Sequence, residues 1–508
     1  MLEFGTAGIR GILGNKKENL NKKHVYRIID GYARYLLKYF PNVKKDGIVI
    51  GRDNRNMSFI FLKLAAKILA KNYKIKVYSS KIPLATPFIS YATKKLRATG
   101  AINITASHNP KEYNGIKLYN QTGAQILPNE VKLITPFFKN YHLIKNNLSN
   151  KKISFDNKRV INIDYLIDKY VKDVSSILGE YKNDKKIEIA FSPLHGTGSI
   201  IMPKIEKMTD IKVHYVKEEM KNSKFFHYAF NPNPEVKSAY DNLIKLMENK
   251  NLKYGLVSDP DADRVGLVEK LDNNEFYYFT GNELATIIFN QLVEKQYFKN
   301  TSALIYSFVS TNLPAIIAQK NNLNTEIIPT GFKWVGPKID QYLPKTNNFQ
   351  AFAFEESYGS LIDYNISYDK DAFQSIIAVI KMLQENSKLS FYQKLQDIYR
   401  KYGYVKSKVI SINFNTFDKV KLNEYLNNFK SLKFELEIDT IIDYRKGYKD
   451  INPENMIQIF FKNKSWVSLR PSGTEPKIKL YIFSINNDEK QAEKILRYLE
   501  QTSYDLFK

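Results

Sequence analysis

The 508-residue chain contains no cysteine. It can therefore form no disulfide, carry no catalytic thiolate and build no thiolate metal site. Apolar runs are short as well, and none approaches the roughly 18 residues that indicate a membrane-spanning helix. The first six residues also lack the basic and then apolar pattern of a secretory signal. These absences predict a cytoplasmic protein without a membrane partner.

The charge balance is strongly basic, with a formal net charge of +25 at pH 7. Such a charge can mark a nucleic-acid partner. The lysines are nevertheless spread along the whole chain, and the sequence has no arginine-rich arm, zinc finger or RNP-type aromatic motif. We attribute the charge to genome composition and to attraction for anionic substrates. We expect no nucleic-acid partner, and a basic nucleic-acid-binding protein remains the alternative from another functional class.

The length of the chain and the order of its expected elements predict four domains. A chain of 508 residues is too long for a single core. Strand, loop and helix patterns recur three times before about residue 400, which is typical of α/β domains with mixed sheets. We therefore expect three consecutive similar α/β domains followed by a smaller C-terminal α+β domain. The expected domains are residues 1–155, 156–278, 279–398 and 399–508.

Several individual elements can be predicted from hydrophobic periodicity. A helix is expected near residues 22–39 and a buried strand at 47–51, followed by polar residues 52–55 at the end where ligands bind in open α/β sheets. Further strands are expected at residues 100–104, 254–257, 351–354, 408–414 and 433–439, with a hairpin formed by 456–461 and 466–469.

Residues 103–119 contain the first candidate for chemistry. The expected strand 100–104 leads into residues 105–110, a dense cluster of small, polar and turn-forming side chains. Pro110 biases Asn109 away from the helical region, so Ser107 is expected on a turn rather than within a helix. A serine in this position is either a turn hydroxyl or a nucleophile, and the local pattern alone favours the turn hydroxyl.

Residues 259–263 contain three aspartates at alternate positions, Asp259, Asp261 and Asp263. These carboxylates repel one another unless a cation lies among them. A calcium EF-hand is excluded, because the sixth position of the loop is Arg264 rather than Gly and the twelfth is Lys270 rather than Glu. Mg²⁺ takes few protein carboxylates together with phosphate oxygens. The motif therefore predicts a Mg²⁺ site, with a solvated acidic turn as the alternative.

Four further segments offer ligands for a phosphorylated sugar. Arg470, Ser472, Gly473 and Thr474 combine a guanidinium, two hydroxyls and an open backbone, as a phosphate-binding loop does. Glu355 and Ser357 follow an expected strand and suit adjacent sugar hydroxyls, and Thr330 and Gly331 are further candidates for sugar binding. Arg10, in the glycine-rich segment 5–11, can bind phosphate in a bidentate manner.

Together these residues predict phosphoryl transfer. A cation held by Asp259, Asp261 and Asp263 would bind a phosphate carried on Ser107, which makes Ser107 both the nucleophile and a metal ligand. Lys117 and Arg264 would stabilise charge near the same phosphate. The base that removes the proton of the attacking hydroxyl is His108, Lys117 or Lys370, and the sequence does not choose among them.

The assembled motifs closely resemble those of the α-D-phosphohexomutase superfamily, which contains phosphoglucomutases and phosphomannomutases. The resemblance spans nearly the whole chain and is carried, in the order of the family, by residues 5–11, 105–110, 259–264, 355–359 and 470–474. It implies four domains around a central cleft, Mg²⁺ as the metal and a resting enzyme phosphorylated on Ser107. The phosphoserine would give its phosphate to a hexose phosphate, and the resulting 1,6-bisphosphate would return its other phosphate to Ser107. Glucose 1,6-bisphosphate or an equivalent sugar bisphosphate would prime the enzyme.

One departure bears on the substrate. The phosphomannomutase and phosphoglucosamine mutase branches typically carry Gly-His after the serine of the sugar loop, whereas this chain has Tyr358-Gly359. Together with residues 330–334 and 192–196, this resembles the bacterial phosphoglucomutase and phosphopentomutase-like branch. We expect interconversion of glucose 1-phosphate and glucose 6-phosphate, with mannose phosphates as further substrates, by a monomer or weak homodimer. A phosphopentomutase with the same chemistry is the alternative, and a catalytically inactive scaffold is disfavoured because no expected ligand is missing.

Overall fold

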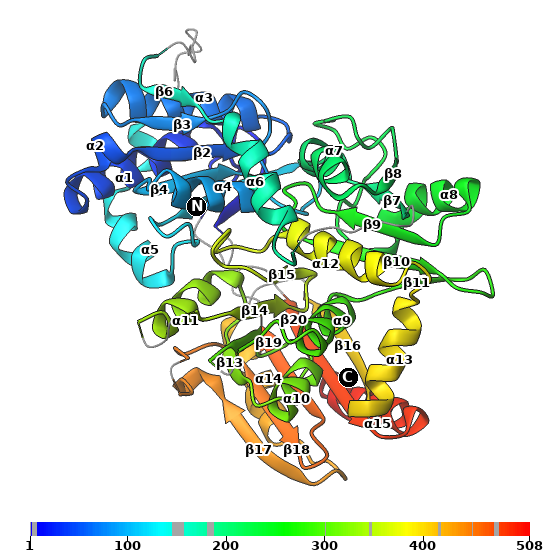
Figure 1. Ribbon diagram of the computed structural model, residues 1–508. Coiled ribbons are helices and arrows are strands. Elements are labelled where there is room, and N and C mark those ends of the chain that lie inside the picture. Colours follow the sequence, from blue (N-terminus) through cyan, green and yellow to red (C-terminus); the bar gives the residue numbers. More distant parts are fainter. Residues whose placement is uncertain are drawn as a thin grey trace.

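The computed structural model describes residue 2 and residues 8–144, 157–179, 187–299, 301–344, 348–414, 418–449, 451–471 and 477–507. These residues form four sheets, each with its own helices (Figure 1). No helix in the described part of the chain has both the length and the apolar character needed to span a membrane.

The first sheet has the strand order β1-β5-β4-β2-β3-β6. Its strands are β1 (Ile9–Ile12), β2 (Ile48–Arg52), β3 (Val77–Ser79), β4 (Gly100–Ile104), β5 (Tyr113–Tyr119) and β6 (Val160–Asn162). Its helices are α1 (Lys22–Tyr39), α2 (Val43–Asp46), α3 (Ser58–Lys67), α4 (Thr86–Lys95) and α5 (Pro128–Ile134). Helix α1 confirms the prediction for residues 22–39, and the side chain of Asn21 caps it by accepting the amide protons of Lys23 and His24. Because β6 pairs with β3, this sheet extends beyond residue 155, and we propose a domain boundary after Asn162.

The second sheet has the order β11-β10-β9-β7-β8. Its strands are β7 (Glu188–Ser192), β8 (Lys212–Tyr215), β9 (Tyr254–Ser258), β10 (Val265–Lys270) and β11 (Phe276–Tyr278), and the nearby helices are α6 (Tyr165–Ser175), α7 (Gly198–Thr209) and α8 (Asp241–Lys250).

The third sheet has the order β13-β12-β14-β15. Its strands are β12 (Ala303–Ser307), β13 (Asn324–Ile328), β14 (Ala351–Glu355) and β15 (Gly359–Leu361). Its helices are α9 (Gly281–Glu294), α10 (Leu313–Lys320), α11 (Val335–Tyr342), α12 (Ala372–Glu385) and α13 (Phe391–Tyr402).

The fourth sheet is antiparallel throughout, with the order β16-β20-β19-β18-β17. Its strands are β16 (Tyr404–Asn413), β17 (Ile438–Asp443), β18 (Ile457–Phe461), β19 (Trp466–Pro471) and β20 (Lys477–Asn486), and its helices are α14 (Lys419–Lys430) and α15 (Glu489–Tyr504). Three mixed α/β sheets followed by an α+β unit confirm the predicted fold class.

The hairpin β18–β19 is confirmed, but the predicted strand at residues 433–439 is wrong for most of its length. Strand β17 begins only at Ile438, and residues 432–437 belong to no strand. Phe434 and Leu436 alternate with polar residues, which produced the strand-like pattern. They instead pack as a loop against the core of the fourth sheet, with the rings of Phe434 and Phe461 5.1 Å apart.

The candidate loops occupy equivalent positions in the first three sheets. In each, a strand in a parallel pair ends at the loop, and the next strand returns antiparallel beside it: β4 to β5, β9 to β10 and β14 to β15. The loop between β19 and β20 also connects two antiparallel neighbours. In the first three sheets this shared topology places a loop with chemically distinctive residues at one end of the sheet.

An aromatic cluster joins the first three domains. The ring of Tyr170 on α6 lies 5.8 Å from Phe88 on α4 and 6.3 Å from Phe373 on α12, measured between centroids. Its hydroxyl donates to both carboxylate oxygens of Asp371 at 2.9 Å. All of these side chains are buried, and the three helices meet near the centre of Figure 1. The cluster fixes the relative positions of the loops that the first three sheets carry.

Candidate active site

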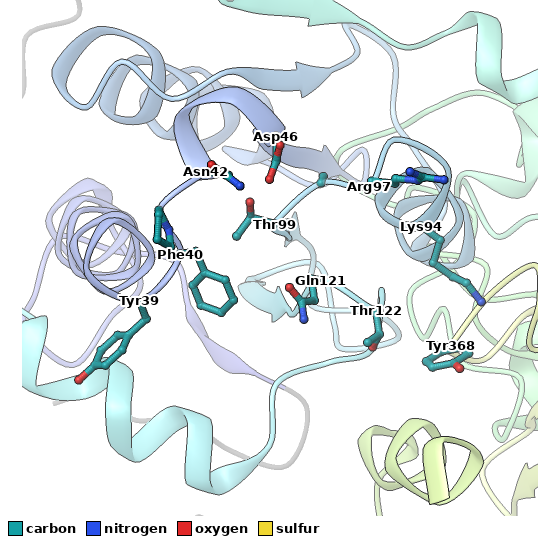
Figure 2. Close-up of a pocket in the computed structure, with 12 residues that line it drawn as sticks. Tyr39, Phe40, Asn42, Asp46, Lys94, Arg97, Thr99, Gln121, Thr122 and Tyr368 are labelled. Atoms are coloured by element: carbon teal, nitrogen blue, oxygen red, sulfur yellow. The ribbon is translucent and has the colours of Figure 1, made fainter. Parts of the chain in front are cut away.

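Two cavities differ in the residues that line them. One, of about 540 Å³, lies between the end of α1, helix α4 and Tyr368. There the side chains of Asn42, Asp46 and Thr99 point into a common space (Figure 2). None of the residues that the sequence predicted for the site lines this cavity.

The other cavity, of about 490 Å³, is a cleft that all four domains line. It brings together ten of the predicted site residues from distant parts of the sequence. They are Arg10, His108, Lys117, Arg264, Thr330, Gly331, Glu355, Ser357, Lys370 and Arg470. Tyr358, which marks the departure from the Gly-His pattern, lines the same cleft. The central cleft is therefore present, and Ser107 and the three aspartates lie buried beside it.

Ser107 lies on a turn, as predicted. Its φ of 52° is in the left-handed region, which is uncommon for a residue with a side chain. The guanidinium of Arg55 holds this turn by donating to the carbonyl oxygens of Ser107, Asn109 and Pro110. Arg55 in turn pairs with Asp53 at 3.2 Å, and both side chains are buried. The polar segment 52–55 therefore supports the loop of the candidate nucleophile.

The hydroxyl of Ser107 faces the acidic loop of the second domain. Its Oγ donates to Oδ2 of Asp259 at 3.0 Å. Nδ1 of His108 lies 3.3 Å from Ser107 Oγ. Ser107 is only 1% exposed. The sequence predicted that serine and aspartates would act together, and the fold places them in direct contact.

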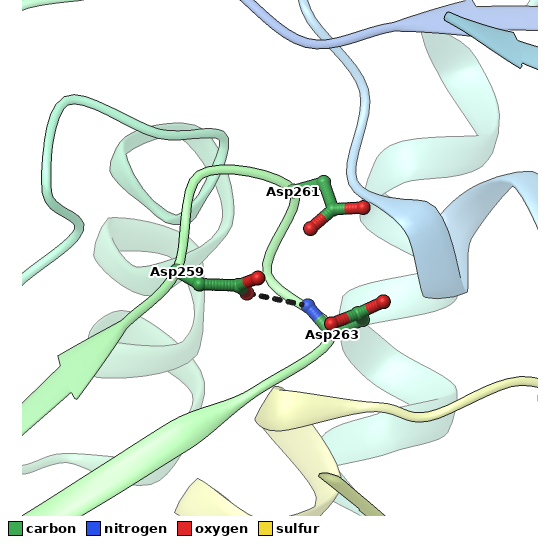
Figure 3. Close-up of side chains that lie close together, drawn as sticks. All are labelled: Asp259, Asp261 and Asp263. Atoms are coloured by element: carbon green, nitrogen blue, oxygen red, sulfur yellow. Dashed lines mark hydrogen bonds between the residues drawn. The ribbon is translucent and has the colours of Figure 1, made fainter. Parts of the chain in front are cut away.

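The three aspartates form a compact group that suits a cation (Figure 3). One carboxylate oxygen from each lies within 4.8 Å of the others, and all three residues are buried. The alternative of a solvated acidic turn is therefore wrong. Protein donors engage both oxygens of Asp259, where Ser107 contacts Oδ2, but only one oxygen each of Asp261 and Asp263. Asp259 Oδ1 accepts the amide protons of Asp263 and Arg264 at 3.1 Å, and Oδ2 of Asp261 and of Asp263 accepts from Lys117 at 2.9 and 3.0 Å.

The remaining oxygens fit a metal ion. Oδ1 of Asp261 and Oδ1 of Asp263 are buried and have no hydrogen-bond partner among the described residues. Burial and the neighbouring charges of Asp261 and Asp263 raise the pKa of Asp259 well above its usual range. Burial opposes ionisation of Asp261 as well, but the ammonium of Lys117 holds its pKa below the usual value. Oxygen donors that repel one another in a buried site are the chemistry that Mg²⁺ requires.

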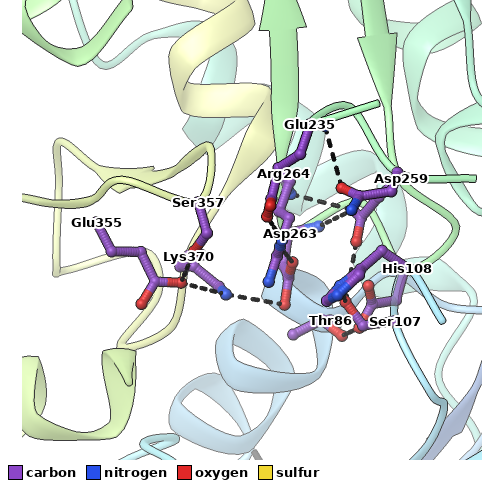
Figure 4. A network of polar contacts seen from close by, with 12 residues as sticks. Thr86, Ser107, His108, Glu235, Asp259, Asp263, Arg264, Glu355, Ser357 and Lys370 are labelled. Carbon is purple, nitrogen blue, oxygen red and sulfur yellow. Dashed lines mark hydrogen bonds and ion pairs between the residues drawn. The ribbon is translucent and has the colours of Figure 1, made fainter. Parts of the chain in front are cut away.

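Basic side chains surround the aspartates (Figure 4). The guanidinium of Arg264 pairs with Glu235 and lies 3.8 Å from Asp263. Nζ of Lys370 donates to Glu355 at 2.7 Å and lies 3.7 Å from Asp263. Each cation therefore connects the acidic loop to a neighbouring carboxylate. A phosphate in the cleft would meet an array of positive charge whose geometry is already fixed.

The electrostatics separate the three candidate bases. Burial disfavours charge on Lys117, yet Asp261 and Asp263 raise its pKa, and Asp263 and Glu355 do the same for Lys370. Both lysines therefore remain ammonium groups. Burial and the charges of Arg264, Arg10 and Lys370 lower the pKa of His108 well below its usual value. His108 is accordingly a neutral imidazole at pH 7, and the same burial and positive charges make it a weaker base than a free histidine.

The predicted sugar loop forms a second polar group in the cleft. Oε1 of Glu355 accepts from Ser357 Oγ at 3.0 Å in addition to Lys370. Burial opposes charge on Glu355, but Lys370 and Arg264 prevail and lower its pKa. Thr330 contributes a buried Oγ1 that has no hydrogen-bond partner in the described part of the chain. These oxygens are available to hydroxyl groups of a ligand.

The predicted phosphate loop is described only in part. Arg470 lies on β19 and reaches the cleft, whereas Ser472, Gly473 and Thr474 lie outside the described residues, as do residues 5–7 of the N-terminal segment. Lys479 lies opposite Arg470 on β20 and also lines the cleft. This lysine was not predicted, because a strand lysine carries no local signal of a site.

Sequence reasoning missed two other residues of this network. Thr86, at the start of α4, donates its hydroxyl to Asp261 Oδ2 at 2.7 Å, and Glu235 pairs with Arg264. Thr86 is 175 residues from its partner and Glu235 is 29 residues away. Their roles depend on contacts between distant segments, and nothing in the local pattern of either residue indicates them.

Comparisons with known proteins agree with this architecture. Residues 1–144, 168–272 and 280–402 match the models of alpha/beta/alpha domains I, II and III of phosphoglucomutase/phosphomannomutase. The chain is 31% identical to a phosphoglucomutase of Staphylococcus haemolyticus (strain JCSC1435), over 98% of this chain and 93% of the relative.

Solved structures share the fold. The open form of the Paramecium phosphoglucomutase parafusin matches with a TM-score of 0.74 at 20% identity, over 99% of this chain and 94% of that chain. Aspergillus fumigatus N-acetylphosphoglucosamine mutase with GlcNAc-6P and magnesium matches with a TM-score of 0.53 at 12% identity, over 100% and 96% of the chains. A variant of that enzyme with glucose 1,6-bisphosphate matches with a TM-score of 0.52 at 13% identity, over 99% and 95%.

Proposed function

Because the chain belongs to the phosphoglucomutase/phosphomannomutase family of phosphohexomutase enzymes, we propose that it interconverts α-D-glucose 1-phosphate and glucose 6-phosphate. The observation that carries the proposal is the 3.0 Å hydrogen bond from Ser107 Oγ to Asp259, within a buried group of three aspartates. A nucleophile, a cation site and an array of basic side chains then share one cleft. That combination suits phosphoryl transfer, in which positioning and charge stabilisation supply most of the catalysis.

In the proposed reaction the phosphate is first carried on Ser107 Oγ. Its bond to Oγ breaks while a bond to a hydroxyl oxygen of the sugar phosphate forms, which produces a 1,6-bisphosphate. Lys117 and Arg264 stabilise the negative charge of the moving group. His108, the neutral imidazole beside Oγ, is our proposed acceptor of the hydroxyl proton, which it then delivers to the departing Ser107 Oγ. The bisphosphate then turns over in the cleft and returns its other phosphate to Ser107.

We propose Mg²⁺ as the metal and glucose 1,6-bisphosphate as the primer. Asp259, Asp261, Asp263 and an oxygen of the phosphate on Ser107 would hold Mg²⁺, which supplies charge neutralisation during transfer. The complexes of the fungal N-acetylphosphoglucosamine mutase with magnesium and with glucose 1,6-bisphosphate support both assignments.

The remaining ligands are assigned by position. We propose that Glu355, Ser357, Thr330 and Gly331 bind the sugar hydroxyls. Arg10 and the loop of Arg470, Ser472, Gly473 and Thr474 would bind phosphate. Glucose is favoured over mannose because the curated relative named above is a phosphoglucomutase. Parallel assays with glucose, mannose and ribose phosphates test this choice, and phosphatase activity without any isomerisation would contradict the mutase proposal.

The phosphoserine cycle can be tested by intact-mass measurement before and after incubation with glucose 1,6-bisphosphate. The parent should gain or lose the mass of one phosphate, whereas Ser107→Ala should show no change. Its mutase activity should fall by roughly four orders of magnitude or more, the scale found when a covalent nucleophile is removed. Ser357→Ala, which alters the sugar loop, should still accept the phosphate. Absence of phosphate on the folded parent under all conditions would reduce Ser107 to a turn residue.

A further inference from the structure

The start of helix α4 contacts the cation site from the opposite domain. The backbone N–H of Thr86 donates to the carbonyl oxygen of Asp261 at 2.8 Å, and the hydroxyl of Thr86 donates to Asp261 Oδ2 at 2.7 Å. Both residues are fully buried. Thr86 therefore forms two hydrogen bonds with Asp261, one to the main-chain carbonyl and one to the carboxylate of Asp261.

The hydroxyl of Thr86 is itself oriented by a third residue. Nδ2 of Asn103, on strand β4, donates to Thr86 Oγ1 at 2.8 Å. A hydroxyl has one proton to donate, and Asn103 already supplies a donor to its oxygen. The proton of Thr86 is thereby directed at Asp261. Asn103 is also fully buried, so water does not compete for this chain of hydrogen bonds.

The chain of bonds decides which oxygen of Asp261 stays free. Thr86 and Lys117 both donate to Oδ2, at 2.7 and 2.9 Å. Oδ1 has no hydrogen-bond partner among the described residues and is buried. A carboxylate with both donors on one oxygen presents the other oxygen in a fixed direction. Without the threonine hydroxyl, Lys117 alone would have to hold that orientation.

The helix reinforces this contact. Ala85, at the N-cap position of α4, has no side chain that can cap the helix. The N–H of Thr86 binds the Asp261 carbonyl instead, and the carboxylate lies at the positive end of a ten-residue helix. Asp261 thus serves as an acceptor for a helix of the first domain while it belongs to the acidic loop of the second.

We propose that Thr86 is a positioning residue of the cation site, which holds Asp261 so that Oδ1 faces the metal. The proposal rests on the proposed function of the three aspartates as a Mg²⁺ site. Because Thr86 and Lys117 belong to the first domain and Asp261 to the second, the site is complete only when the two domains are packed together. Partners of this kind typically change metal affinity by about 10- to 100-fold.

The test is a titration of the full-length protein with Mn²⁺, followed by electron paramagnetic resonance, which reports binding without catalysis. Thr86→Val keeps the shape of the side chain and removes the hydroxyl, and it should weaken Mn²⁺ binding about tenfold or more. Thr86→Ser, which restores the hydroxyl, should bind Mn²⁺ nearly as tightly as the parent. Raising the Mg²⁺ concentration should recover mutase activity in Thr86→Val, because the reacting groups remain in place.

Thr93→Val is the matched control. Thr93 is a buried threonine on the same helix, and its hydroxyl donates to the carbonyl of Ile89 at 2.7 Å, away from the cleft. It should leave Mn²⁺ binding unchanged while it reports the cost of removing a buried hydroxyl from α4. A second variant, Asn103→Ala, frees the Thr86 hydroxyl to rotate and should weaken binding by a smaller factor.

If Thr86→Val and Asn103→Ala are both folded and both bind Mn²⁺ as tightly as the parent, the proposal is overturned. Equal losses in Thr86→Val and Thr93→Val would also overturn it, since the effect would then belong to helix stability. A parent protein that binds no Mn²⁺ would contradict the proposed metal site itself. That outcome can be told apart from failure of the Thr86 proposal, because in that case neither the parent nor any variant would bind Mn²⁺.

Discussion

The two ends of the cleft are built differently. At the end that carries Ser107, the three aspartates and Lys117, every one of these residues is at most 1% exposed. At the other end, Arg470 projects from β19 of the fourth domain and is only partly buried. The first end has the geometry of a protein interior, and the second has that of a binding surface.

The contacts between domains also differ at the two ends of the cleft. The buried end is held across the first two domains by the pairs Thr86–Asp261, Lys117–Asp261 and Ser107–Asp259. The fourth domain contacts the third through a hydrogen bond from Gln458 to the carbonyl of Phe308 at 3.0 Å and through the rings of Phe308 and Tyr444, 4.9 Å apart. In the proposed reaction, charge must be positioned in advance where the phosphoryl group moves, whereas the second phosphate needs only to be bound. We therefore propose that the buried end carries the chemistry and the Arg470 end the recognition.

The largest effect should follow from Asp261→Asn at the buried end. It removes a negative charge from the cation site and from Lys117, so metal binding and mutase activity should both fall by roughly a hundredfold or more, beyond the effect of an outer-shell partner. Mn²⁺ titration and a mutase assay over a range of Mg²⁺ measure this. Asp30→Asn is the control, since Asp30 is also buried but pairs with Arg34 on helix α1, away from the cleft. If Asp261→Asn binds the metal as tightly as the parent, the proposed difference in role between the aspartate end and the Arg470 end of the cleft is wrong.

A different kind of loss is expected from Arg470→Ala at the recognition end. Hydrogen bonds to a charged group contribute about 1.5–3 kcal/mol, so KM for glucose 1-phosphate should rise by roughly 10- to 100-fold with a smaller change in kcat. Steady-state kinetics separates the two constants. Arg445→Ala is the control, because Arg445 belongs to the same domain but pairs with Asp443 outside the cleft. A fall in kcat at constant KM would show that Arg470 acts in the transition state, and the two ends would then share one role.

The smallest effect concerns pH and the support of the acidic loop. Thr197 donates its N–H to the carbonyl of Pro260 at 2.9 Å, and the neighbouring His195 is held between the carbonyl of Lys221 and the N–H of Tyr228. Burial lowers the pKa of His195 below its usual value of about 6.5. The folded state therefore binds this proton less readily than the unfolded state. The associated stability is fully present above about pH 6.5 and is lost as the pH falls through the folded pKa.

His195→Gln should accordingly reduce the fall in Tm between pH 7 and pH 5, because a glutamine can make both hydrogen bonds without titrating. Thermal denaturation across that range measures the difference. His142→Gln is the control, because His142 is an exposed histidine of the first domain. If Tm depends on pH identically in the parent and in His195→Gln, then titration of His195 does not contribute to the loss of stability at low pH.

Much of this molecule could be predicted from local patterns. The helix α1 and the strands that lead into the candidate loops were found because apolar residues recur at helical or strand-like spacing. The turn at Ser107 followed from Pro110 and its neighbours. The strand predicted at 433–439 was wrong because the alternation of Phe434 and Leu436 describes a loop packed on a core as well as it describes a strand. The returning strands β5, β10 and β15 were not predicted. Each forms by pairing with a neighbouring strand of the assembled sheet, and this pairing leaves no separate signal in the local sequence.

The amino-acid sequence by itself determined which charged groups the fold has to accommodate. Three aspartates at alternate positions repel one another, so Asp259, Asp261 and Asp263 need compensating positive charge or a proton once they are buried. Only the tertiary structure decided which atoms do what. Lys117 lies 144 residues from Asp261, and Thr86 lies 175 residues from it. The charge states of the two lysines and His108, and the oxygen that Asp261 leaves free, depend on burial and on these distant neighbours. Such contacts form only when the first and second domains pack against each other.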